Sequence, residues 1–163
     1  MSGVIKVGMA DLNAIVSPGI LTTLGLGSCV GIVFYDNKNK IGGMAHVMLP
    51  TSRIANGDKI NEAKFADTAI EKLLELMISM GAKQTFITAK LAGGAQMFAS
   101  RNGSNDVLKI GHKNVEQTLK ILQEKNIKVV AQDTGSNYGR TIELYSESGL
   151  LLVKTIGHGV KEI

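Results

Sequence analysis

The sequence contains a single cysteine, no tryptophan and only two prolines among its 163 residues. One cysteine excludes an intrachain disulfide, so we expect the chain to fold without covalent cross-links in a reducing compartment. No apolar run reaches the ~20 residues that a membrane-spanning helix requires. The first residues lack the pattern of a signal peptide. We therefore expect a cytoplasmic protein without direct membrane insertion, which reaches any membrane only through a partner.

Arginine is also scarce, although the formal net charge is +4. Only Arg53, Arg101 and Arg140 are present, and the remaining basic residues are lysines that are spread along the chain. Arginine dominates contacts to base edges, and no basic run is interleaved with aromatic residues. The sequence therefore argues against a nucleic-acid partner.

The hydrophobic pattern predicts one α+β domain, residues 1–163. Amphipathic helices are expected over 61–80, where Gly81 follows as a C-terminal residue, and over 112–125. Because strands and helices do not alternate strictly, we expect mixed sheets and not a doubly wound parallel sheet. The stretches 22–27 and 91–105 are expected to be irregular. Strands are expected at 4–9, 12–16, 30–35, 40–49, 84–89, 127–132, 141–145 and 150–155.

Two glycines come shortly before the cysteine in Gly25-Leu26-Gly27-Ser28-Cys29. The stretch does not fit a dinucleotide-binding loop, because the third glycine is missing and a strand follows it. A tight turn here can instead direct the backbone N–H groups of Ser28 and Cys29 at a carbonyl oxygen, as an oxyanion hole requires. A lone cysteine is more often a buried core residue. Its position at the start of a strand favours a nucleophile.

His46 is the natural base for Cys29. The strands on either side of the turn at 36–39 can pair as a hairpin. Cys29 lies six residues before Tyr35 and His46 lies six residues after Lys40, so this pairing would place Cys29 opposite His46. Directly opposed residues have Cβ atoms about 5 Å apart. A histidine at that distance can deprotonate the thiol. The alternative is a core histidine bonded to a backbone carbonyl.

The rest of the sequence offers several groups that could orient the imidazole, but no metal site. Thr23, Asp133 and Asn137 could each accept an imidazole N–H, and the residues alone do not choose among them. His112 and His158 have no companions at metal-ligand spacing. We therefore expect neither a metal nor an organic cofactor.

The stretch from Gly93 to Phe98 (GGAQMF) is the other unusual segment. It can be a loop that wraps the core, or it can expose an apolar contact for a partner protein. We take Gly93, Gly94, Met97 and Phe98 as candidate partner-binding residues.

Two of these motifs closely resemble the CheD family of chemoreceptor glutamine deamidases. They are residues 23–31 (TLGLGSCVG) and 42–50 (GGMAHVMLP), and 66–70 and 93–98 are also similar to the family. The resemblance runs from about Met9 to Thr155. It implies a cysteine hydrolase with a Cys-His-Thr triad, which would be Cys29, His46 and Thr23. It also implies a layered α-β-β-α fold like the catalytic domain of the cytotoxic necrotizing factor deamidases.

The resemblance further implies a reaction and partners. Specific glutamines on the cytoplasmic helices of methyl-accepting chemotaxis receptors would be converted to glutamate through a thioester, and glutamyl methyl esters could be hydrolysed by the same chemistry. A partner in several bacteria is CheC, a phosphatase of the phosphorylated response regulator, whose binding can inhibit the deamidase. Two alternatives stay open: a docking module that binds receptors and CheC without catalysis, and a cysteine peptidase.

Overall fold

The computed structural model describes residues 3–54, 60–96 and 109–163. In these residues the chain forms two five-stranded sheets and two α-helices. The helices are α1 (Ala66–Ser79) and α2 (Ile110–Glu124). The strands are β1 (Gly3–Lys6), β2 (Leu12–Val16), β3 (Gly19–Leu26), β4 (Val30–Asp36), β5 (Ile41–Val47), β6 (Ile87–Gly93), β7 (Lys128–Thr134), β8 (Arg140–Tyr145), β9 (Leu150–Thr155) and β10 (Gly159–Glu162).

Both sheets are mixed. The first sheet has the order β1-β3-β8-β9-β10, with β1 parallel to β3. The second has the order β2-β5-β4-β6-β7, with β6 parallel to β7. The expected single α+β domain with mixed sheets is confirmed. No helix among the described residues is long and apolar enough to cross a bilayer.

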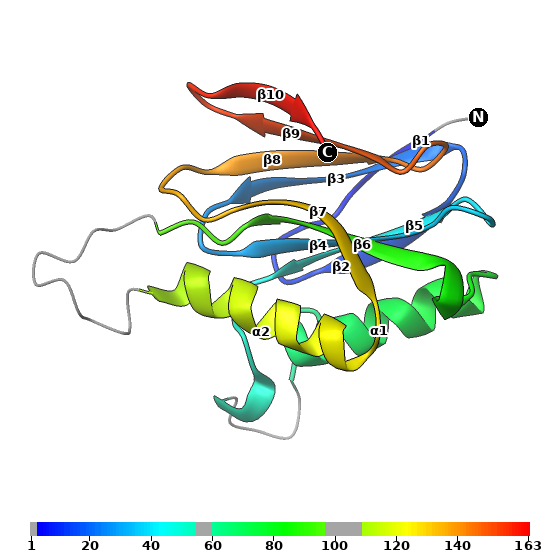
Figure 1. Ribbon diagram of the computed structural model, residues 1–163, viewed down its shortest axis with the longest axis horizontal. Coiled ribbons are helices and arrows are strands. Elements are labelled where there is room, and N and C mark those ends of the chain that lie inside the picture. Colours follow the sequence, from blue (N-terminus) through cyan, green and yellow to red (C-terminus); the bar gives the residue numbers. More distant parts are fainter. Residues whose placement is uncertain (1–2, 55–59, 97–108) are drawn as a thin grey trace, which may run out of the picture.

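The second sheet is the middle layer of the molecule (Figure 1). One of its faces packs against α1 and α2, and the other packs against the first sheet, so every residue of β4 and β5 is buried. Phe34 belongs to the core on the helix side, whereas Met44 belongs to the core between the sheets. Fully burying one such side chain contributes about 1.5–3 kcal/mol. In the described chain the layers run sheet, sheet, helix, which leaves the space between the sheets as a second interior.

The helices follow the expected apolar periodicity, with small differences at their ends. Helix α1 begins at Ala66 and not at residue 61, and the carboxylate of Asp67 in its first turn accepts hydrogen bonds from the N–H and hydroxyl of Ser52. It ends before Gly81, which has a φ of 110°. Helix α2 begins two residues earlier than expected.

Two strands lie where the sequence indicated irregular or unassigned chain. Strand β3 covers most of the stretch 22–27, and a bulge between Thr23 and Leu26 shifts its register with β8, where Gly25 has a φ of 69°. Strand β10 was not expected at all. Strand β6 also continues through Gly93, while residues 84–86 form a 3₁₀ turn and not a strand.

Candidate active site

His46 is the second-to-last residue of β5, and hydrogen bonds of its backbone hold it in place. Its N–H donates to the carbonyl of Asp11 over 2.9 Å, and its carbonyl accepts the N–H of Ala10 over 3.0 Å. Only 1% of the residue is exposed. Its side chain lies between the two sheets, so the imidazole is held in an interior from which bulk water is largely excluded.

Thr23, on β3 of the opposite sheet, determines which nitrogen of His46 carries the proton. The Thr23 Oγ1 lies 2.7 Å from His46 Nδ1, and the same hydroxyl donates to the carbonyl of Val7 over 2.6 Å. A hydroxyl has one proton. Because that proton goes to Val7, Thr23 must accept the N–H of Nδ1. The tautomer that follows has an unprotonated Nε2, which has no hydrogen-bond partner among the described residues.

The register of β4 and β5 differs from the expected one by two residues. Gly31, and not Cys29, pairs with His46, because the turn places Asp36 opposite Ile41. The expected direct opposition of Cys29 and His46 is therefore wrong. A shift of two residues keeps both side chains on the same face of the sheet. By this register Cys29, two residues before Gly31, is diagonal to His46. Gly31 has no side chain, and the side chains of Ile142 and Leu26 occupy the space above it.

Cys29 lies in the turn that joins β3 to β4, immediately before β4 begins. It is 8% exposed and belongs to the core between the sheets. Its carbonyl accepts the N–H of Gly94 over 2.8 Å, and the carbonyl of Gly27 accepts the N–H of Ala95 over 2.8 Å. Residues 27–29, which we name the nucleophile turn after the candidate nucleophile Cys29, are thus held against the end of β6.

The protonation states of the pair follow from its burial. Burial raises the pKa of the Cys29 thiol above its usual 9.0, and the residue's own backbone N–H partly offsets this by stabilising the thiolate. Burial lowers the pKa of His46 below 6.5. At neutral pH the resting site therefore holds a neutral thiol and a neutral imidazole. Such a pair suits a general base that removes the thiol proton during the reaction.

The candidate partner-binding stretch is only partly within the described residues. Gly93 and Gly94 are buried, which fits a loop that wraps the core, and their part in partner binding stays a prediction. Both have positive φ values, 103° and 64°. A Cβ on Gly93 would meet the carbonyl oxygen of Cys29, so this position requires glycine for close packing on the nucleophile turn. Met97 and Phe98 lie outside the described residues.

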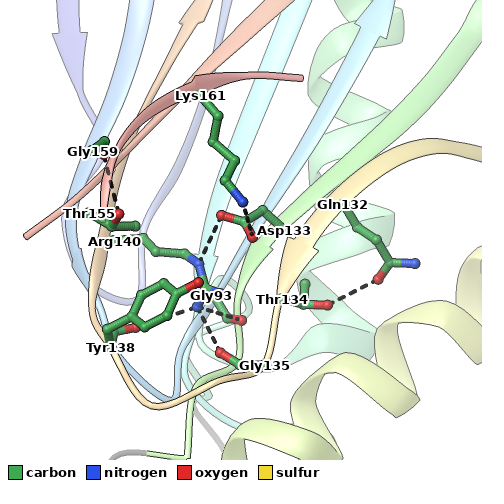
Figure 2. Close-up of polar contacts among 10 residues, drawn as sticks. All are labelled: Gly93, Gln132, Asp133, Thr134, Gly135, Tyr138, Arg140, Thr155, Gly159 and Lys161. Carbon is green, nitrogen blue, oxygen red and sulfur yellow. Dashed lines mark hydrogen bonds and ion pairs between the residues drawn. The ribbon is translucent and has the colours of Figure 1, made fainter. Parts of the chain in front are cut away.

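The guanidinium of Arg140 lies beside Gly93, at the end of β6 (Figure 2). It is 2% exposed, and its Nε donates to the carboxylate of Asp133 over 3.2 Å. Its Nη1 donates to the carbonyls of Gly135, over 3.0 Å, and Gly93, over 3.4 Å. Lys161 of β10 reaches the other oxygen of Asp133. The buried guanidinium therefore joins β8 of the first sheet to β6 and β7 of the second sheet.

The other candidates from the sequence lie away from the imidazole. Asp133 forms an ion pair with Arg140, and Asn137 is exposed. Of the three possible orienting groups, Thr23 is the one that contacts His46. His112 is exposed and faces Glu116 over 3.2 Å. Across residues 3–54, 60–96 and 109–163, no three potential metal ligands gather.

Asn114 is a residue that the sequence analysis overlooked. It is fully buried on α2, and its side-chain amide donates to the carbonyls of Ser28 and Met48. A polar residue in the apolar stripe of an amphipathic helix was the signal that could have identified it.

Comparison with known proteins identifies the family. The model of the family described as CheD chemotactic sensory transduction matches residues 48–155. A protein of Caldanaerobacter subterraneus subsp. tengcongensis named probable chemoreceptor glutamine deamidase CheD is 57% identical, and the alignment covers 99% of each chain. One of Lachnoclostridium phytofermentans with the same name is 52% identical, and the chemoreceptor glutamine deamidase CheD of Halalkalibacterium halodurans is 48% identical; both alignments cover 100% of each chain. This chain belongs to the CheD family.

Proposed function

We propose that this protein is a chemoreceptor glutamine deamidase, which converts receptor glutamine side chains to glutamate with release of ammonia. The names of its full-length relatives support this substrate and reaction. The structural observation that best supports a hydrolase is the Thr23–His46 hydrogen bond. It leaves His46 Nε2 free as a base, on the face of the sheet that also carries the only cysteine of the chain.

In the first half of the proposed reaction, Cys29 Sγ attacks the side-chain carbon of the substrate amide. His46 Nε2 takes the thiol proton as the carbon–sulfur bond forms. The backbone N–H groups of Ser28 and Cys29 stabilise the negative charge that develops on the amide oxygen. The carbon–nitrogen bond then breaks, and the imidazolium returns the proton to the departing ammonia, which leaves a thioester on Cys29.

In the second half, water hydrolyses the thioester. His46 Nε2 takes a proton from the water as its oxygen attacks, the carbon–sulfur bond breaks, and the proton returns to the Cys29 sulfur. The sum is addition of water to glutamine to give glutamate and ammonia. A glutamyl methyl ester can follow the same steps with methanol as the leaving group, so we include methylesterase activity in the proposal.

Thr23 acts in this proposal as the group that orients the base. Its hydroxyl holds the imidazole in one plane and one tautomer, and it stabilises the imidazolium that forms after proton transfer. Cys29, His46 and Thr23 together are the proposed triad.

We also propose that the protein acts in the cytoplasm, on the cytoplasmic helices of methyl-accepting receptors, and that CheC is a partner where it is present. These partners rest on the family and its relatives' names. The main alternative is a docking module without catalysis, and a peptidase is the second.

The test is to incubate a purified receptor cytoplasmic fragment with the wild-type protein and with Cys29→Ala, and then to measure intact mass and map peptides. Glutamine-to-glutamate conversion by the wild type alone supports the proposal. Conversion by both proteins would remove Cys29 from the mechanism. Binding without conversion favours the docking module, and new fragments would indicate a peptidase.

A further inference from the structure

Asn114 connects the helical layer to the turn that carries Cys29 and to the chain directly after β5, which carries His46. Its Nδ2 donates to the carbonyl of Ser28 over 2.9 Å and to the carbonyl of Met48 over 3.0 Å. Ser28 immediately precedes the cysteine, and Met48 lies two residues after His46. One amide group therefore joins the nucleophile turn to the end of β5.

The orientation of the Asn114 side chain is determined by these partners. Both neighbours are carbonyl oxygens, which only accept, so the NH₂ end of the amide must face them. The Oδ1 is then buried without a hydrogen-bond partner among the described residues. An unpaired buried acceptor is destabilising. A residue that costs stability at the edge of a candidate site is more readily explained by function than by packing.

The hydrogen bond to Ser28 also determines where the next N–H points. The Ser28–Cys29 peptide is trans, so its carbonyl and its N–H point in opposite directions. With the Ser28 carbonyl held by Asn114, the Cys29 N–H points to the side of the peptide opposite Asn114, and this N–H lowers the pKa of its own thiol. The Cys29 carbonyl is held separately by the N–H of Gly94. Both peptides flanking the Cys29 Cα are therefore fixed.

We propose that Asn114 is a positioning residue: it fixes the Ser28–Cys29 peptide so that the Cys29 N–H forms the oxyanion hole, and it sets the spacing between the nucleophile turn and β5. The inference rests on the proposed deamidase function. Asn114 touches neither substrate nor reacting atoms, so it acts through the backbone that it holds.

The test compares Asn114→Leu and Asn114→Asp with Thr118→Val. Leucine is close to asparagine in shape and cannot donate, and aspartate keeps the size but presents oxygens to two carbonyls. Thr118 is the matched control, because it is fully buried one turn further along α2 and donates to the backbone carbonyl of Asn114 without reaching the site. Its substitution reports how far a weakened α2 alone affects the site.

Two readouts are needed, and one does not depend on the receptor. The first is the rate of alkylation of Cys29 by iodoacetamide against pH, which reports on this residue alone because the chain has no other cysteine. The second is kcat and KM for deamidation of a receptor fragment. We expect both Asn114 variants to shift the alkylation profile to higher pH. We expect kcat to fall about tenfold to a hundredfold, with KM within about twofold, because an oxyanion donor is misplaced. Thr118→Val should change neither.

The inference is overturned if Asn114→Leu folds and leaves both the alkylation profile and kcat like those of Thr118→Val, since Asn114 is then only structural. It is also overturned if Thr118→Val reproduces the full effect. If the wild type does not deamidate the receptor, the proposed function fails. The alkylation comparison still decides whether Asn114 positions the Cys29 peptide.

Discussion

A single hydroxyl proton decides the chemistry that His46 can perform. The Thr23 hydroxyl donates its proton to the carbonyl of Val7 over 2.6 Å, so it can only accept a hydrogen bond from the His46 imidazole. The alternative from the sequence, a core histidine bonded to a backbone carbonyl, would give the same tautomer where Nδ1 is the donor. What differs is the other nitrogen, because Nε2 has no partner among the described residues and lies on the face that carries Cys29.

Replacing Thr23 by valine should reduce catalysis without dismantling the fold. The variant keeps the side-chain shape and removes the acceptor for His46 Nδ1, so we expect kcat to fall about tenfold to a hundredfold, part of what a general base supplies. Thr22→Val is the matched control, because Thr22 is also buried and its hydroxyl donates to Ile142 without contacting His46. Steady-state deamidation and thermal unfolding should show similar stabilities and different activities. Equal kcat values for the two variants would contradict a role for Thr23.

The pH profile should show that the base stays neutral into mildly acidic solution. The proposed mechanism requires unprotonated His46, and burial lowers the pKa of this residue, so the acid limb of kcat/KM should have its midpoint below 6.5. Activity is then complete above 6.5 and is lost as pH falls through the lowered pKa. The same titration in Cys29→Ala, followed by imidazole NMR signals, provides the control. A midpoint above 6.5 would contradict the lowered pKa of His46. A resting thiolate–imidazolium pair would be recognised separately, by loss of activity at alkaline pH as the imidazolium deprotonates.

At the scale of elements, the helices and most strands were predictable, whereas β3 and the hairpin register were not. The apolar periodicity of α1 is a local property that the sequence displays directly. The glycine and the bulge in β3 mask its alternation, and its pairing with β1 and β8 comes from residues far along the chain. The register of β4 and β5 differs from the expected one because Asp36 fixes the length of the turn. Its carboxylate accepts hydrogen bonds from the backbone N–H groups of Asn39, in the turn, and Lys83. Asn114 was missed because its partners are backbone carbonyls.

Helix α2 approaches the end of β6 so closely that Gly111 should not tolerate a methyl group. A Cβ there would meet the carbonyl oxygen of Ala95 and would lie 2.7 Å from the backbone of Gly94. Alanine in a helix gains up to about 1 kcal/mol over glycine. Overpacking against rigid backbone costs about 1–3 kcal/mol or more. We therefore expect Gly111→Ala to lower the free energy of unfolding in a urea titration, whereas Lys113→Ala, at an exposed position of the same helix, should be nearly neutral. A stabilised Gly111→Ala would show that the two elements are further apart.

At the scale of the whole molecule, the proposed site depends on contact between the two sheets. Thr23 comes from the first sheet, and His46 comes from the second. The ion pair of Arg140 and Asp133 also crosses from β8 to β7, and Figure 2 shows it beside Gly93. This ion pair, in which Arg140 is buried and Asp133 is partly exposed, therefore joins the sheets close to the nucleophile turn.

Removing Asp133 should be far more damaging than removing its second partner. Asp133→Ala leaves the guanidinium of Arg140 buried without its counter-ion, so we expect a loss of about 3–5 kcal/mol in the free energy of unfolding. Lys161 is half-exposed and lies 3.5 Å from the same carboxylate, so Lys161→Ala should change stability by less than about 1 kcal/mol. Chemical denaturation of both variants provides the measurement. A loss for Asp133→Ala as small as that expected for Lys161→Ala would mean that other groups compensate the charge of Arg140.

In the proposed mechanism, the hydrogen bond between Thr23 and His46 makes the distance between the sheets a condition for activity. Any motion that separates the layers by even the length of one hydrogen bond frees the imidazole to rotate, while each sheet remains intact by itself. We therefore expect the rate of deamidation to depend on how often the two sheets separate. Mild denaturant or heat, which loosens the contact between the sheets, should abolish deamidation under conditions where the circular dichroism signal of the strands is still unchanged.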